Sequence, residues 1–232
     1  MIDSVQHKAQ LRDYFDGAGF ERWTAIYGQG ELGRVRRSIR VGHDRMLKQA
    51  ATWLSEAGIG PGMRVLDAGC GTGLWSVALA EQGCLVTAVD IAPKMVAATR
   101  ARAEERRVVD RLTLLTGDLE QVRGSFDVVV CFDVLVHYPP PSFAALLSRL
   151  AACSAGPLLL TYAPRKPLLA ALHWVGGHFP QGQRRTEIQM IPPQAVKTML
   201  ATAGMHVRHS TNINHGFYHV QLVEAYPDSI FS

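Results

Sequence analysis

Short apolar runs alternate with amphipathic stretches through the middle of the chain. The apolar runs end at glycine, proline or aspartate and predict strands over residues 64–68, 85–89, 112–116, 127–131 and 157–161. Helical spacing of apolar residues lies between them, near 74–82, 93–107 and 142–153. Because strands that alternate with helices pair in parallel, this pattern predicts an α/β fold with helices on both faces of an open sheet.

The first sixty residues follow another pattern, with many aromatic side chains. Helices are predicted over 3–15 and 18–28, then a polar, arginine-rich stretch over 28–42, then a helix over 43–57 that stops at Gly58. We interpret residues 1–58 as an N-terminal helical cap and residues 59–232 as a catalytic domain, the two forming one structural unit. Plain packing of these aromatic side chains is the alternative.

Residues 164–192 interrupt the strand and helix alternation. An apolar run, 167–175, contains His173 and Trp174, and the basic pair Arg184 and Arg185 follows. We interpret this insertion as a lid segment, while the apolar run itself suits a packed helix first, and a pocket wall or a membrane contact as alternatives. The regular pattern returns with a helix near 193–203 and strands near 205–209 and 217–224.

Composition narrows the class of protein. With 232 residues, 47% of them hydrophobic and 19% charged, the chain suits one globular domain with a modest cap. The net charge of +4 suits an anionic small molecule or an acidic surface, or a solvated basic face, and requires no nucleic acid. The four cysteines show no metal-binding spacing, so we expect reduced thiols, no metal site and a cytoplasmic protein. We expect no membrane span, while contact with a membrane surface stays open.

Three glycines follow the first predicted strand, in the sequence RVLDAGCGTG at 64–73. Gly69, Gly71 and Gly73 allow a tight turn and a close approach of a ligand to the backbone, and the next helix begins with free N–H groups. Leu74 stands where a dinucleotide fingerprint has its third glycine, and the chain lacks a P-loop lysine. The turn therefore predicts a nucleoside site without a diphosphate.

Acidic residues end the first three predicted strands. Asp90 can accept both hydroxyls of a ribose, Gly117 and Asp118 can hold an adenine edge, and Asp67 can orient a cationic amine directly or through water. A helix cap or a turn former is the alternative for Asp90 and for Asp118, each taken alone. Together they favour an adenosyl group that carries an amino acid.

These residues resemble the class I S-adenosylmethionine-dependent methyltransferases in DAGCGTG, Asp90, the GD pair at 117–118 and CFDVLVHY after the fourth strand. The resemblance covers about 60–225 and implies a Rossmann-like, doubly wound, seven-stranded, mostly parallel sheet whose last strand is antiparallel. It implies S-adenosyl-L-methionine as the cofactor and S-adenosyl-L-homocysteine as its product. We assign to the cofactor Asp67, Gly69, Gly71, Gly73, Asp90, Ile91, Met95, Gly117, Asp118, Leu119, Asp133, Val134, Tyr14 and Arg40.

Four further segments are similar to the magnesium-protoporphyrin IX O-methyltransferases of chlorophyll and bacteriochlorophyll biosynthesis. They are YFDGAGFERWTAIYG (14–28), IRVGHDRM (39–46), DVLVHY (133–138) and GFYHVQLVEA (216–225), so the similarity includes the cap and is weakest over 164–192. The resemblance implies an enzyme that esterifies one propionate of magnesium protoporphyrin IX to the monomethyl ester. It also suggests docking to the upstream magnesium chelatase, because that enzyme would hand over an insoluble pigment.

The expected catalytic residues are His137 and Tyr27. His137 could hold the propionate by a hydrogen bond or lie axial to the substrate's magnesium, with a structural histidine as the alternative, and Tyr27 could orient the sulfonium or the carboxylate. Substrate contacts are expected from Phe20, Trp23, Tyr138 and Arg184, with Arg40 or Arg185 as other partners for the unreacted propionate. A methyltransferase of a quinone precursor and a non-catalytic adenosyl-binding protein are the competing hypotheses.

Overall fold

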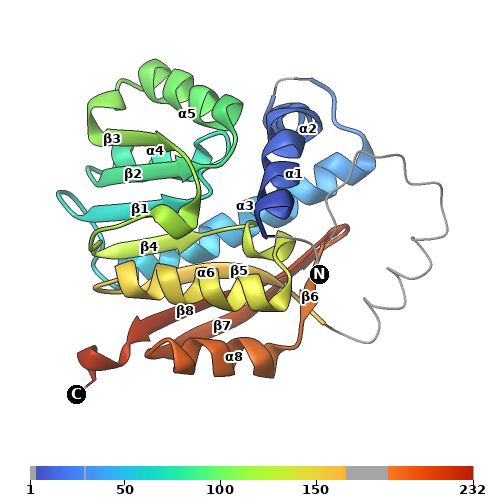
Figure 1. Cartoon of the computed structure of the whole chain (residues 1–232). Helices are drawn as coiled ribbons and strands as arrows, with labels where there is room; N and C mark the ends of the chain where they lie inside the picture. The colour runs from blue at the N-terminus through green and yellow to red at the C-terminus, as the bar shows by residue number, and fades with distance from the viewer. Residues whose placement is uncertain (1–3, 29, 166–187, 232) are drawn as a thin grey trace.

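A central sheet crosses the whole molecule, with helices on both of its faces (Figure 1). The computed structural model describes residues 4–28, 30–165 and 188–231. Along the sheet the strands follow the order β3-β2-β1-β4-β5-β8-β7. The short strand β6 lies outside this order and pairs with β5. The strands are β1 (Arg64–Ala68), β2 (Leu85–Asp90), β3 (Leu112–Thr116), β4 (Val128–Cys131), β5 (Leu158–Pro164), β6 (Met190–Ile191), β7 (Met205–His215) and β8 (Tyr218–Pro227).

The predicted seven-stranded, mostly parallel sheet is confirmed, with β6 as a two-residue addition. Strands β1 to β5 pair in parallel, whereas β8 is antiparallel to both β5 and β7. Strands β7 and β8 are longer than predicted. In β7 half-buried and exposed positions alternate along an edge strand, and its exposed polar residues leave no continuous apolar run in the sequence.

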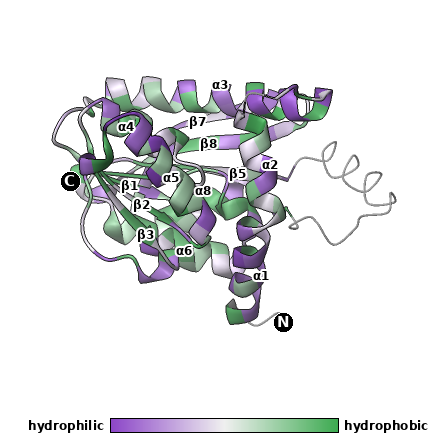
Figure 2. Cartoon of the chain, turned by 90° about the horizontal axis from the view of Figure 1, so that it is seen from above, coloured by the Kyte–Doolittle hydropathy of each residue, from purple (hydrophilic) through white to green (hydrophobic). Residues whose placement is uncertain are grey.

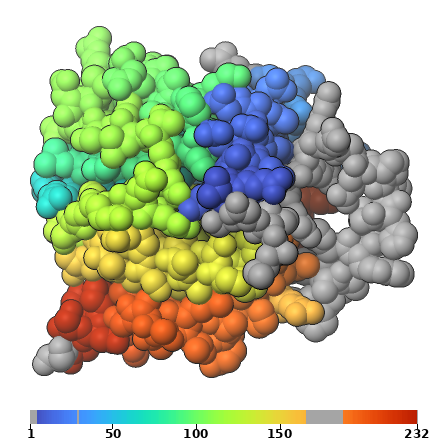
Figure 3. Space-filling model, in the orientation of Figure 1, coloured from blue at the N-terminus to red at the C-terminus, as the bar shows by residue number. Residues whose placement is uncertain are grey.

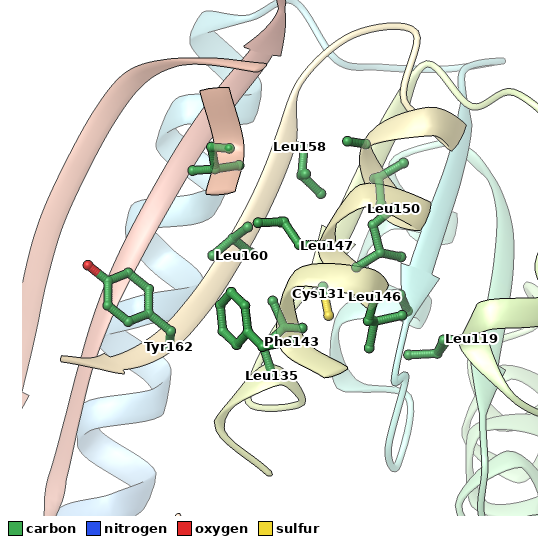
Figure 4. Packing of buried hydrophobic residues seen from close by; sticks show 14 of the residues in the cluster. Leu119, Cys131, Leu135, Phe143, Leu146, Leu147, Leu150, Leu158, Leu160 and Tyr162 are labelled. Carbon is green, nitrogen blue, oxygen red and sulfur yellow. The ribbon is translucent and has the colours of Figure 1, made fainter. Parts of the chain in front are cut away.

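Helices cover the two faces in separate layers. On one face α6 (Pro140–Cys153) and α8 (Pro193–Thr202) pack over β4, β5 and β7. Figure 4 shows Phe143, Leu147 and Leu150 of α6 directed at Leu158 and Leu160 of β5. On the other face lie α4 (Leu74–Glu81) and α5 (Pro93–Glu105), which contact β2. This packing fixes the carboxyl ends of β1, β2 and β4 at one edge of the sheet.

Helix α3 (Arg34–Glu56) packs along β7 and β8 (Figure 2) and begins well before the predicted start at residue 43. Arginine is a good helix former, and the polar stretch is the exposed part of this helix. Gly42 allows the helix to approach the sheet, because a Cβ there would lie 2.5 Å from the Cβ of Tyr218. Since Met46 and Ala50 are fully buried, α3 belongs to the core as well as to the predicted cap.

Helix α1 (Ser4–Asp16) packs against α5 and against α2 (Ala18–Tyr27), and α2 packs against α3. Figures 1 and 3 show these N-terminal helices in blue. Polar contacts anchor α1: Lys8 Nζ lies 2.7 Å from both Asp118 Oδ2 and Glu120 Oε2, and Asp16 Oδ1 accepts a 2.8 Å bond from the Lys94 N–H. The boundary at residues 58 and 59 stays a prediction. The short 3-10 helices are η1 (Val109–Arg111), η2 (Leu119–Gln121), η3 (Leu135–His137) and η4 (Asp228–Ile230).

Within the described ranges, we find no helix with the length and apolar character needed to cross a membrane. The four cysteines are all buried and carry free thiols. The apolar run 167–175, its His173 and Trp174, and the basic pair Arg184 and Arg185 lie outside the described residues, so the predicted lid stays a prediction.

Candidate active site

A cavity opens where the carboxyl ends of β1, β2 and β4 meet the N-terminal helices. Parallel sheets of this kind bind ligands at this edge, where the strand order reverses beside β1. Most of the predicted site residues line the cavity: Asp67, Gly69, Gly71, Asp90, Ile91, Met95, Leu119, Asp133, Val134, Trp23, His137 and Tyr138. The structure therefore brings the predicted cofactor and substrate residues to one place.

The glycine turn is shaped for a ligand on one side only. Gly69, Gly71 and Gly73 all have positive φ angles, of +88°, +54° and +76°. A Cβ at Gly69 would lie 2.1 Å from Val134 Cγ2, and one at Gly73 would lie 2.7 Å from Thr99 Cγ2, so both positions exclude a side chain. Gly71 has nothing within 4 Å of such an atom and faces the cavity. Its backbone is therefore open to a ligand in the cavity.

Asp90, at the end of β2, holds the turn together. Asp90 Oδ2 accepts a 3.0 Å bond from the Gly71 N–H and Oδ1 accepts a 2.9 Å bond from the Ala92 N–H. Burial raises its pKa to about 6, against the lowering effect of these backbone hydrogen bonds. Each carboxylate oxygen has a second lone pair, so the group can still accept hydroxyl hydrogens from a ligand in the cavity.

Asp67, at the end of β1, is a second buried carboxylate in the cavity wall, 3% exposed. Ser76 Oγ donates to its Oδ2 at 2.5 Å. Burial, helped by the negative charge of Asp90, raises the pKa of Asp67 to about 6, while the Ser76 hydrogen bond opposes the shift. Two buried carboxylates on one wall make that wall favourable for a cationic ligand.

Gly117 and Asp118 make hydrogen bonds that hold the turn at the end of β3. The Gly117 N–H donates to the Asp90 carbonyl at 2.9 Å, and Asp118 Oδ1 caps η2 by accepting from the Glu120 N–H at 3.0 Å. Asp118 Oδ2 is paired with Lys8 of α1. Among the described residues, the next residue, Leu119, lines the cavity, whereas Gly117 and Asp118 do not. Gly73 does not line it either. Their direct cofactor contacts stay predictions.

His137 and Tyr138 follow β4 in and after η3, and both line the cavity. The His137 ring packs against Phe15 of α1 with centroids 5.1 Å apart, and the His137 carbonyl accepts a 2.9 Å bond from His7 Nε2. Tyr138 is 5% exposed, and burial raises the pKa of its phenol. Helix α1 thus fixes the segment that carries the predicted catalytic histidine.

Tyr27 and Arg40 lie beside the main cavity and line a neighbouring one together with Arg37 and Leu32. The Arg40 guanidinium is 5.6 Å from the centroid of the Tyr27 ring. Tyr27 reaches the main cavity indirectly, because its hydroxyl makes a short hydrogen bond to His43 Nδ1 and His43 lines that cavity. Tyr14 and Phe20 are not among the described residues that line either cavity, and the predicted contact Arg184 lies outside the described ranges.

Asp133 begins the segment after β4 with a φ of +57°, which aspartate tolerates better than most residues. Its carboxylate accepts bonds from Tyr218 Oη, 3.0 and 2.9 Å from its two oxygens, and from Thr161 Oγ1 at 3.1 Å. His43 Nε2 lies 3.8 Å from Asp133 Oδ2. A carboxylate predicted to touch the cofactor is therefore also the centre of a polar cluster.

Several cavity residues were missed by the sequence analysis. They are Leu11, Phe15, His43, Leu47, Cys70, Thr72, Leu74, Trp75 and Phe132. Leu11 and Phe15 are four residues apart on α1, so helical spacing could have placed them on one inward face. His43 had no such signal, since its partners lie on other elements.

The arrangement fits S-adenosylmethionine. Gly71 offers an open stretch of backbone, Asp90 offers acceptors for ribose hydroxyls, and buried Asp67 suits the amine of the methionine part. A glycine turn after β1, a carboxylate ending β2 and a reversed last strand in a seven-stranded path together define a class I methyltransferase. A general methyltransferase domain model matches residues 65–155.

Comparisons with known proteins identify the family within that class. The family model of the magnesium-protoporphyrin IX methyltransferase C-terminus matches residues 131–227. Magnesium-protoporphyrin O-methyltransferase of Synechocystis is 36% identical over 96% of this chain and 97% of its own length, and that of Rhodobacter capsulatus is 30% identical over 97% and 99%. The chain therefore belongs to the magnesium-protoporphyrin IX methyltransferase family.

A solved structure agrees with this assignment. The crystal structure of the Synechocystis magnesium protoporphyrin IX methyltransferase with bound SAH aligns with a TM-score of 0.87 at 36% identity. The alignment covers 95% of this chain and 99% of that chain. The α1–α3 region is therefore part of the shared fold, as the predicted similarity of residues 14–28 and 39–46 requires.

Proposed function

We propose that this chain transfers the methyl group of S-adenosylmethionine to a propionate carboxylate of magnesium protoporphyrin IX, giving the monomethyl ester in (bacterio)chlorophyll biosynthesis. One observation carries the proposal: a single cavity joins the glycine turn and its two carboxylates to Trp23, His137 and Tyr138. The glycine turn and the two carboxylates suit the cofactor. Trp23, His137 and Tyr138 offer apolar surface and a polar ring at the place where an acceptor must meet the methyl group.

The residues have little acid or base chemistry to perform. A propionate has a pKa near that of glutamate, about 4.3, so it is already an anion at neutral pH. When bound, S-adenosylmethionine supplies an electrophilic methyl group on a positively charged sulfur. Asp67, Asp90 and the Gly71 backbone would hold it, and the apolar side chains around them exclude water from the reacting anion and cation. The protein's main work is placement.

His137 would hold the reacting carboxylate by a hydrogen bond from the segment after β4. Replacement by alanine is expected to lower kcat/KM roughly 30-fold, because a hydrogen bond to a charged group contributes about 2 kcal/mol. His137→Gln, which keeps a donor, should recover part of this loss. Methyl ester formation followed by mass spectrometry measures the effect.

His206→Ala is the matched control for this prediction, because His206 is exposed on β7, where its ring packs against Phe231. It should leave kcat/KM within twofold of the original protein. An unchanged rate in His137→Ala would remove His137 from the mechanism.

Arg40 would bind the unreacted propionate from the second cavity, whose lining carries two positive side chains, Arg37 and Arg40, against one negative side chain, Glu31. Arg40→Gln is expected to raise KM for the porphyrin about tenfold with kcat nearly unchanged, since one charged contact remote from the reacting atoms is lost. Arg36→Gln is the matched control, because Arg36 is exposed on the same helix and is not among the residues that line this cavity. Equal effects of the two substitutions would contradict the assignment.

The decisive experiment is a direct assay. The protein is incubated with S-adenosylmethionine and magnesium protoporphyrin, and the pigment should gain the mass of one methyl group. Soret-band titration tests binding separately. Binding without a mass gain would favour a non-catalytic adenosyl-binding protein, and absence of both would favour a methyltransferase of another small acceptor, such as a quinone precursor.

Delivery of the pigment by magnesium chelatase and contact with a membrane surface stay proposals as well. Their support is chemical, because the substrate is flat and largely apolar. On the protein side, Phe217 at the β7–β8 turn is 69% exposed and Val35 on α3 is 46% exposed. Co-sedimentation with anionic lipid vesicles, and separately with the chelatase subunits, tests the two ideas.

A further inference from the structure

Three polar side chains from three elements lie in a row between the two cavities. Tyr27 at the end of α2 is hydrogen-bonded through its hydroxyl to His43 Nδ1 on α3, and His43 Nε2 faces Asp133 Oδ2 at 3.8 Å. His43 is 8% exposed and lines the main cavity, while Tyr27 lines the neighbouring one. This row therefore connects the two places where parts of a substrate would lie.

The groups around His43 decide which nitrogen carries hydrogen. Asp133 lies on the Nε2 side, held by Tyr218 of β8, whose ring also packs on the imidazole at 6.0 Å. A carboxylate on that side favours hydrogen on Nε2 and leaves Nδ1 as an acceptor. The Tyr27 hydroxyl then donates to Nδ1, with Asp44 as a second, longer partner at 3.3 Å.

The surroundings of His43 and Tyr27 favour the uncharged form of both side chains. Burial lowers the pKa of His43 against the opposing charges of Asp133 and Asp44, so the imidazole is neutral near pH 7. Burial and the Asp44 charge raise the pKa of Tyr27, so the phenol keeps its proton, although Arg40 acts in the opposite direction. Trp23 completes the surroundings with an uncharged ring 5.4 Å from that of His43.

In this state the Tyr27 hydroxyl has no hydrogen to offer to a substrate. Its one hydrogen is directed at His43, and a carboxylate that approached the oxygen would meet only lone pairs. A protonated imidazole removes the conflict, because both of its nitrogens are donors. Nδ1–H then donates to the tyrosine oxygen, and the tyrosine O–H becomes available.

We propose that His43 takes up one proton from solvent when the porphyrin binds, which reverses the Tyr27–His43 hydrogen bond and turns the Tyr27 O–H toward the unreacted propionate beside Arg40. The inference rests on the proposed function. The proton enters at Nδ1 and returns to solvent when the porphyrin leaves, and none is transferred to the product. His43 is therefore a positioning residue that acts through Tyr27.

Proton uptake can be measured directly. Magnesium protoporphyrin is titrated calorimetrically into the full chain saturated with S-adenosylhomocysteine, at pH 7.5, in phosphate and in Tris, which differ in ionisation enthalpy. More than half a proton is expected to be taken up for each porphyrin bound. His43→Gln should bind the porphyrin at least tenfold more weakly with almost no uptake. The matched control His219→Gln on β8, where His219 Nδ1 lies 3.1 Å from Asn214 Oδ1, should keep the uptake.

Tyr27→Phe is the second variant, in case His43→Gln fails to fold, because it keeps the imidazole and removes the hydroxyl that the proton reorients. It should also lose the uptake. Porphyrin binding with no buffer dependence in the original protein, or uptake that persists in either variant, overturns the inference while methyl transfer and the proposed function stand. Absence of porphyrin binding to the original protein would overturn both.

Discussion

Replacement of Asp90 by alanine is expected to lower the affinity for S-adenosylhomocysteine on the order of 10³-fold. A buried carboxylate at the end of β2 can accept two hydroxyl hydrogens, and two hydrogen bonds to a charged group at about 2 kcal/mol each give about 4 kcal/mol in total. The substitution also releases the N–H groups of Gly71 and Ala92 from their acceptor. Isothermal titration calorimetry measures the loss.

Asp90→Asn separates binding from folding in this prediction. Because burial raises the pKa of Asp90 to about 6, the ionised carboxylate destabilises the ligand-free protein at pH 7.5, and the amide removes that charge. The amide also loses one of the two backbone hydrogen bonds, because its NH2 group cannot accept from an N–H. The two effects oppose each other, so the Asn variant should unfold near the temperature of the original protein and still bind much more weakly. Asp110→Asn, at an exposed position before β3, is the control with unchanged affinity. Full affinity in Asp90→Asn would contradict a role in binding the ribose.

The cofactor wall could be predicted from the sequence because its chemistry lies at strand ends. A glycine turn after an apolar run and an aspartate at the end of the next run are local features, and parallel strands bring their ends to one edge. Asp67, Gly71 and Asp90 accordingly line the predicted cavity. The same argument predicts Asp118 at this edge, where its carboxylate also caps η2 and pairs with Lys8, and its contact with the cofactor stays a prediction.

The acceptor side could be predicted only in outline, because it is built from contacts between distant segments. Lys8 and Asp118 are 110 positions apart, and His7 and His137 are 130 apart. Neither pairing leaves a local pattern in the chain. His43 was missed for the same reason, since its position between Tyr27 and Asp133 depends on how α3 packs along the sheet. The arginine-rich start of α3 looked like a polar connection because its helical face is exposed.

Cofactor affinity is expected to fall between pH 7 and pH 5, by about tenfold for each of two carboxylates. Burial raises the pKa of Asp67 and of Asp90 to about 6, from an ordinary value of 3.8. In the ligand-free protein the stability that these groups contribute is full below pH 3.8 and is lost as the pH rises through 6. A bound amine and ribose hydroxyls favour the ionised forms, so binding below pH 6 must release protons and weakens.

S-adenosylhomocysteine is the ligand for this measurement, because it keeps the amine and the ribose. Dissociation constants measured by calorimetry from pH 5 to pH 7 should rise up to about 100-fold toward acid in the original protein. Asp67→Asn should show weaker binding at pH 7 and about half of the logarithmic pH dependence, because only Asp90 then titrates. Asp110→Asn should reproduce the full dependence. Constant affinity from pH 5 to pH 7 in the original protein would mean that neither carboxylate meets the ligand as an anion, and the proposed cofactor contacts of both would fail together.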